Sequence, residues 1–120
     1  GLLPDMSATQ SLRRLTSLDR MKELVLTGRK FNGEQAQTYG LATELSDTPL
    51  EDALAMARAI AGYNPDAVRA AKHILNQSGL VDVATGLAEE AAATRQLLGS
   101  ANQVEAVTAQ FEGRVPEFQD

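Results

Sequence analysis

The sequence predicts a mostly helical protein, in which short irregular pieces come first and four helices follow. Between residues 49 and 111 the apolar side chains recur at the three- and four-residue spacing of a helix. Two of these stretches begin with a capping residue, Thr48 or Asn64, and carry proline in the first helical position. The change of pattern near Thr48 predicts two regions, residues 1–48 and residues 49–120.

The first region is expected to alternate short helices with extended pieces. Ser7 can cap a helix over residues 7–15, and Ser17 can cap another that closes at Gly28. Further along, Gly40 is expected to stop a third short helix. The remaining pieces are an extended stretch over 29–33, the third helix from residue 33, and a short strand over 41–45.

The second region is expected to be helical almost throughout. Its longest helix contains Gly86, which costs about 1 kcal/mol relative to alanine and indicates a close helix contact or a bend. The four predicted helices cover residues 48–61, 64–75, 80–100 and 101–114, and residues 115–120 form a tail.

Composition excludes several kinds of site. The 120 residues contain no cysteine and one histidine, so disulfides, thiol nucleophiles and multi-histidine metal sites are ruled out. The net charge is −5 without a basic stripe, which argues against nucleic-acid binding, and no apolar run approaches the length of a membrane span. With neither signal peptide nor cysteine to mark a compartment, we expect a cytoplasmic protein.

The helices are rich in alanine, and aromatic residues make up only 4% of the chain. A chain of this length can bury a core of its own. At roughly 25 cal/mol per Å² of apolar surface, however, small side chains gain more by packing against a larger body. Composition therefore leaves three arrangements open: an oligomer, attachment to another domain, and an ordinary small bundle.

Three motifs occur in register with a known family. They are Gly1 to Pro4 followed by the Thr9-Gln10 pair, the Leu-Thr-Gly triplet at 26–28, and the Ala-x-x-x-Gly-Leu stretch at 36–41. The tail "EAVTAQFEGRVPEF" is also similar to the ending of that family. Together these pieces resemble the enoyl-CoA hydratase/isomerase (crotonase) family along the whole chain.

The resemblance implies that this is the C-terminal segment of a crotonase-like α/β fold, since family members are about twice as long. Gly1 would then lie just after the position of a catalytic glutamate. Residues 1–48 would form the end of the core at the edge of the active site. Residues 49–120 would form a helical oligomerisation region, and the parent enzyme would be a homo-oligomer, a trimer or a hexamer.

The resemblance also implies a reaction, the hydration or isomerisation of a carbon–carbon double bond in an enoyl-CoA thioester. Two backbone N–H groups hold the thioester carbonyl and stabilise an enolate-like state, while carboxylates move protons or activate water. Asp5 matches a position where some isomerases carry a catalytic acid. Leu2, Leu3 and Met6 would line the acyl pocket. No metal or redox cofactor is expected, because CoA is part of the substrate.

Two departures from the family pattern bear on these residues. The turn at residues 6–8 lacks the usual glycine pair, which leaves open whether the acyl pocket is narrowed. In the tail, Gln110 and Gly113 stand where an aromatic residue and a lysine of the family reach a neighbour's CoA. Arg114 is the candidate to replace that contact. Asp5 also has a structural alternative, since aspartate after proline is a routine turn and cap residue.

Other functions remain compatible with the sequence. The chain can be a non-catalytic helical association module that caps another chain or binds copies of itself through its alanine-rich faces. It can also be a small bundle that binds acyl-CoA without turnover. The resemblance does not separate hydratase from isomerase, and we expect this chain alone to be inactive, because the oxyanion hole lies in the half of the family that it lacks.

Overall fold

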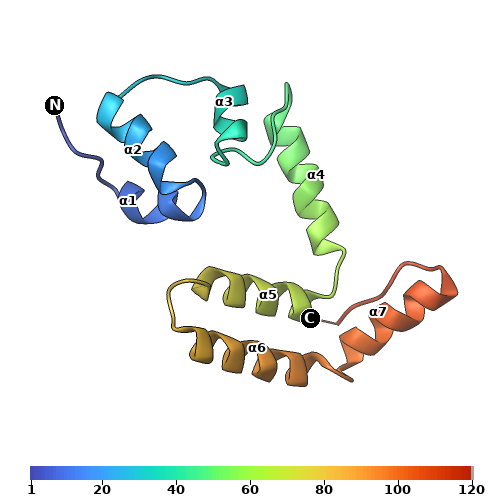
Figure 1. Ribbon diagram of the computed structural model, residues 1–120. Helices are drawn as coiled ribbons and strands as arrows, with labels where there is room; N and C mark the ends of the chain where they lie inside the picture. The colour runs from blue at the N-terminus through green and yellow to red at the C-terminus, as the bar shows by residue number, and fades with distance from the viewer. Residues whose placement is uncertain (120) are drawn as a thin grey trace. The chain divides into compact units, whose positions relative to one another are not determined.

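The computed structural model describes residues 1–119, and the chain divides into two compact units, Gly1–Asp52 and Ala53–Asp120. Every regular element within residues 1–119 is a helix, as Figure 1 shows. The expectation of a mostly helical chain is therefore confirmed.

The first unit is built from short helices joined by tight turns. Helix α2 is its longest, and it ends where Gly28 adopts the left-handed conformation (φ 60°) that suits a glycine C-cap. Asn32 begins α3 with a capping box, in which its side chain accepts from the backbone N–H of Gln35. The elements are α1 (Ala8–Ser11), the 3₁₀ helix η1 (Leu12–Arg14), α2 (Leu18–Thr27) and α3 (Gly33–Thr38).

Ser7 stands at the predicted helix start, but its side chain does not cap the helix. An N-cap residue normally has extended backbone, which lets its side-chain oxygen reach the exposed N–H groups of the first turn. Ser7 instead has φ 64° and ψ 10°, in the left-handed region. The helix starts where expected, and the prediction of its cap is wrong.

The strand predicted over residues 41–45 is also wrong. The backbone N–H groups of Leu41 and Ala42 both donate to the carbonyl of Ala36, at 2.8 and 3.2 Å. These bonds fold the segment back onto the end of α3, so its first donors are not available to a neighbouring strand. No other segment within residues 1–119 is a strand that could pair with it.

The helices predicted from residue 48 onward are all present. Asn64 caps α5 as expected, since its Oδ1 accepts from the N–H groups of Asp66 at 3.0 Å and Ala67 at 3.4 Å. Helices α5 and α6 run side by side in opposite directions, and α7 also contacts α5 (Figure 1). The bounds are α4 (Pro49–Ala61), α5 (Pro65–Gln77), α6 (Val83–Leu97) and α7 (Ala101–Glu112).

Residues 1–119 bury very little apolar surface, although a chain of this length can bury a core of its own. Within residues 1–119, Ala109 is the one apolar residue that is fully buried, at 1% exposure. Large apolar side chains along the helices remain open, including Phe111 at 88%. The physical reason lies in the packing, because few faces meet and the alanines on them cover little area. Other exposed examples are Leu26, Leu50, Leu75, Leu80, Val83 and Leu98.

Candidate functional site

Asp5 lies in a tight turn directly before α1, and its side chain is exposed. The backbone carbonyl of Asp5 accepts from the N–H of Ala8 at 2.9 Å, which closes the turn. The two residues inside it, Met6 and Ser7, have φ values of 50° and 64°. Left-handed backbone is costly for residues with a Cβ and tends to occur where the surroundings dictate a turn. The sequence departs from the family's glycine pair at this same turn.

The apolar residues predicted to line the acyl pocket surround Asp5 in the chain. Leu2 is 98% exposed, Leu3 is largely exposed, and Met6 is 95% exposed. Their role in lining a pocket stays a prediction, because within the described residues these side chains are too exposed to enclose one.

A small apolar cavity of about 110 Å³ lies beside this segment but does not include those three side chains. Pro4 forms one wall, Leu12 of η1 a second, and Met21 and Val25 of α2 a third. The turn that begins at Asp5 therefore has exposed apolar side chains in it and before it, and Pro4 and Ala8 on either side of it line the cavity. This apolar surface suits an aliphatic group, because the transfer of such a group out of water is favourable.

Arg114 belongs to the second unit, where carboxylates surround it. Its guanidinium bonds both oxygens of Glu105, with Nη2 2.9 Å from Oε2, and its Nε donates to Glu112 at 2.6 Å. Glu105 and then Glu112 raise the pKa of Arg114, because both stabilise the charged form. A phosphate could bind Arg114 only by competing with these two partners, and the predicted CoA contact stays a prediction.

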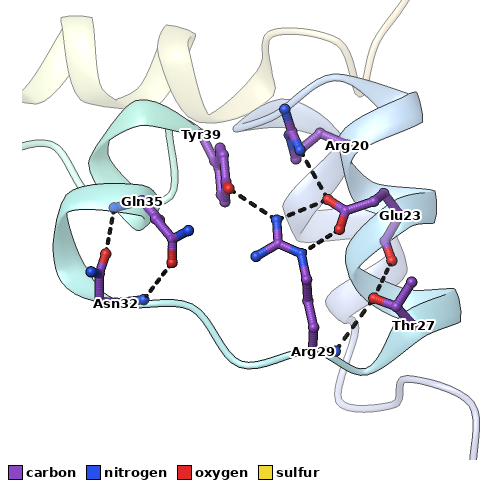
Figure 2. Close-up of polar contacts among 7 residues, drawn as sticks. All are labelled: Arg20, Glu23, Thr27, Arg29, Asn32, Gln35 and Tyr39. Carbon is purple, nitrogen blue, oxygen red and sulfur yellow. Dashed lines mark hydrogen bonds and ion pairs between the residues drawn. The ribbon is translucent and has the colours of Figure 1, made fainter.

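A polar cluster joins α2 to α3 in the first unit (Figure 2). Glu23 accepts from Arg29 through both carboxylate oxygens and from Arg20 at 2.9 Å. Arg29 also donates to the hydroxyl of Tyr39 at 2.9 Å, and the Arg20 guanidinium lies 4.4 Å from the centre of the Tyr39 ring. The hydrogen bonds from Arg29, followed by those from Arg20, lower the pKa of Glu23 to about 2.

A larger hollow of about 500 Å³ opens beside this cluster, between the end of η1, the start of α2 and the end of α3. Arg14 and Arg20 contribute cations to its wall, and Ser17, Thr16 and Thr38 contribute hydroxyl groups. Arg20 is already paired with Glu23, so the hollow is less cationic than its two arginines suggest.

The polar contacts that hold each unit together were not predicted from the sequence. The pair Arg20–Glu23 has the i,i+3 spacing of helix neighbours, so that part was visible in the sequence. The contacts of Arg29 with Glu23 and with Tyr39 span six and ten residues, so no helical spacing in the sequence indicates them. The same holds for Asn102, a buried amide in α7 that bonds Asp66 from 36 residues away.

Residues 1–119 contain no group of three or more His, Asp or Glu side chains placed to hold a metal ion. None of the described helices is long and apolar enough to cross a membrane.

Comparison with known proteins places the whole chain within one family. The family model described as "Enoyl-CoA hydratase/isomerase" matches residues 1–120. The mouse protein named "Enoyl-CoA hydratase domain-containing protein 2, mitochondrial" is 36% identical over 124 residues, which cover 98% of this chain and 42% of the mouse protein. The "2,3-dehydroadipyl-CoA hydratase" of Escherichia coli K12 is 34% identical over 98% of this chain and 47% of its own length.

Solved structures give the same result at the level of the fold. The crystal structure of an enoyl-CoA hydratase from Bacillus anthracis superposes with a TM-score of 0.88 at 33% identity, over 98% of this chain and 46% of that one. The chain thus spans less than half the length of the relatives it matches. The matches do not confirm the expectation that it corresponds to the C-terminal part of such an enzyme.

Proposed function

Because the chain belongs to the enoyl-CoA hydratase/isomerase family, we propose that it is part of an enzyme that hydrates or isomerises a carbon–carbon double bond in an enoyl-CoA thioester. The observation that carries this proposal is similarity along the whole chain to proteins named as acyl-CoA hydratases. CoA is then part of the substrate, and no resident metal or redox cofactor takes part. The chain alone is expected to be inactive, since it spans under half the length of those relatives.

Within this proposal Asp5 carries a proton between carbon atoms of the acyl chain. An acid that transfers a proton in the transition state contributes roughly 10²- to 10⁴-fold to the rate. The position of Asp5 supports the role, because its neighbours Leu2, Leu3 and Met6 are exposed and the adjacent Pro4 lines the apolar cavity. These three apolar side chains would contact the acyl chain, and Arg114 would contact the CoA moiety.

The test compares Asp5→Asn with Asp47→Asn in the complete encoded protein. Asp47 is also an exposed aspartate of the first unit, so it controls for the loss of one charge. Hydration is followed by the loss of absorbance of a short 2-enoyl-CoA, and isomerisation by its appearance from the 3-enoyl isomer. We expect kcat to fall at least 100-fold in Asp5→Asn only. Unchanged kcat for both reactions would remove Asp5 from the site.

A second candidate function is a non-catalytic helical association module. The exposed apolar residues of α4 to α7, such as Leu50, Leu80 and Phe111, favour association of this region with other chains. Association also fits the enzyme, whose helices from Pro49 onward would join copies into a trimer or hexamer. Turnover therefore separates the two candidates, and size in solution does not.

The first measurement is the mass of the protein under denaturing conditions, compared with the encoded reading frame. An encoded protein about twice as long that turns over enoyl-CoA would support the enzyme. A reading frame limited to these residues, with no turnover, would support the association module. The cytoplasmic location expected from the sequence stays a prediction, because several relatives are named as mitochondrial.

A further inference from the structure

Asn102 joins three parts of the second unit through one buried side chain. It is 6% exposed, and its Nδ2 donates to Oδ2 of Asp66 in α5 and to the backbone carbonyl of Gln119 in the tail, each at 2.8 Å. Its Oδ1 accepts from the backbone N–H of Gln119, also at 2.8 Å. The amide of Asn102 therefore pairs with both main-chain groups of Gln119, as a neighbouring strand would.

Glu105 holds the same tail one helical turn further along α7. Its carboxylate accepts from the backbone N–H of Glu117 at 2.8 Å and binds the Arg114 guanidinium. These contacts, with Arg114 the larger cause, lower the pKa of Glu105 to about 2. The carboxylate is consequently charged near neutral pH and remains a strong acceptor.

The two contacts lie along one side of the tail and one face of α7. Residues 117 and 119 are two apart in an extended segment, so their N–H groups lie on the same side, roughly 6.6 Å from each other. Asn102 and Glu105 are three apart on α7 and face the same direction from consecutive turns. Gln119 lies beside Asn102 and Glu117 beside Glu105, so the tail runs antiparallel to the helix.

We propose that residues 114–119 form a tail latch, which Asn102 and Glu105 hold by its main chain and which fixes α7 against α5 through Asp66. Every hydrogen bond from these two side chains to residues 117 and 119 goes to backbone. At residues 117 and 119 the latch therefore holds the main chain of an extended segment, whereas Arg114 is held through its guanidinium. Releasing the tail would remove two of the three hydrogen bonds of the Asn102 amide and leave only its bond to Asp66, which disfavours the open state.

The chemistry of Asn102 suggests a swap that isolates the latch. Asn102→Asp keeps the acceptor for Gln119 but removes both donors and places a carboxylate beside that of Asp66. When Asp66→Asn is added to that variant, the new amide at position 66 can donate to the carboxylate at position 102. The hydrogen bond between the two positions is then restored with donor and acceptor exchanged. The two single variants and the double variant form a cycle that measures the coupling between positions 66 and 102.

The experiment measures hydrogen exchange at the amides of Glu117 and Gln119 in the complete protein. We expect Asn102→Asp to lower the protection of Gln119 at least tenfold, and the Asp66→Asn/Asn102→Asp double variant to recover most of it. Gln110→Glu is the matched control, because it adds the same charge at an exposed position of α7 and should leave protection unchanged.

A second variant keeps the test valid if Asn102→Asp unfolds the unit. Glu105→Ala should expose the amide of Glu117 while the contact between Asn102 and Asp66 remains. Full protection of Gln119 in a folded Asn102→Asp protein would overturn the proposal, as would a double variant no better protected than the single one. Full protection of Glu117 in Glu105→Ala would also overturn it.

Discussion

The guanidinium of Arg29 binds both carboxylate oxygens of Glu23, with Nε donating to Oε1 and Nη2 3.0 Å from Oε2. The two residues are six positions apart, beyond the three- and four-residue spacing at which helix neighbours meet. They meet because Gly28 ends α2 in the left-handed conformation and turns the chain back. This ion pair therefore depends on the geometry of the helix end.

The pair should make the first unit sensitive to acid. The pKa of Glu23 is about 2 in the folded chain, below its ordinary value of 4.5, so the unfolded chain binds the proton more tightly. The stabilisation is complete above about pH 4.5 and is lost as the pH falls toward 2. Glu23→Gln should lower the thermal midpoint at pH 7 and reduce its further fall between pH 5 and pH 2.5. Glu44→Gln, at an exposed position, is the control, and equal pH profiles for the two variants would contradict the prediction.

Two glycines that both have a positive φ angle should differ in how well they tolerate substitution by alanine. Gly28 has φ 60° and open space where a Cβ would stand, so Gly28→Ala should cost about 1 kcal/mol through backbone strain alone. At Gly40, with φ 78°, an added Cβ would lie 2.4 Å from the carbonyl oxygen of Leu15. Backbone must then move, and Gly40→Ala should cost roughly 3 kcal/mol or more. Urea denaturation checks both, and equal losses would argue against this close approach.

Removing the Asn64 cap should cost more stability than removing the side chain of Ser17. It is 8% exposed and its side chain accepts from two N–H groups of the first turn of α5. Asn64→Ala should lower the free energy of unfolding by about 1–2 kcal/mol. Ser17 occupies the same position before α2 without a side-chain bond to the helix backbone, so Ser17→Ala should cost less. Chemical denaturation followed by circular dichroism measures both, and a larger loss for Ser17→Ala would refute the comparison.

Glycine in the turn after Asp5 should stabilise the chain. Ser7 has φ 64° and makes no side-chain cap bond, so Ser7→Gly relieves the left-handed strain and removes no capping contact. The gain should be roughly 0.5–1 kcal/mol, since part of the relief is offset by the greater freedom of glycine in the unfolded chain. Ser11→Gly is the control, because Ser11 has φ −70° and should lose stability instead. A loss in both variants, measured as thermal midpoints, would show that the turn is not strained.

The sequence by itself determined the local elements of this protein. Helix starts and stops depend on neighbouring residues, so Asn64 with Pro65 and Gly28 after α2 could be placed without a fold. Motifs such as the Leu-Thr-Gly triplet at 26–28 carried the family resemblance, which the match over residues 1–120 now supports. Asp5, Leu2, Leu3, Met6 and Arg114 were nominated through that resemblance and remain to be tested.

Only the tertiary structure decided how distant residues meet and what remains open. A strand at residues 41–45 satisfies the local pattern, but the carbonyl of Ala36 takes its first donors. Similarly, no spacing in the sequence pairs Asn102 with Asp66 and Gln119, since these contacts span 36 and 17 residues. The apolar stripes predicted buried faces, yet most of those side chains are exposed. A stripe specifies which face of a helix avoids water, and only packing against another surface decides whether it does.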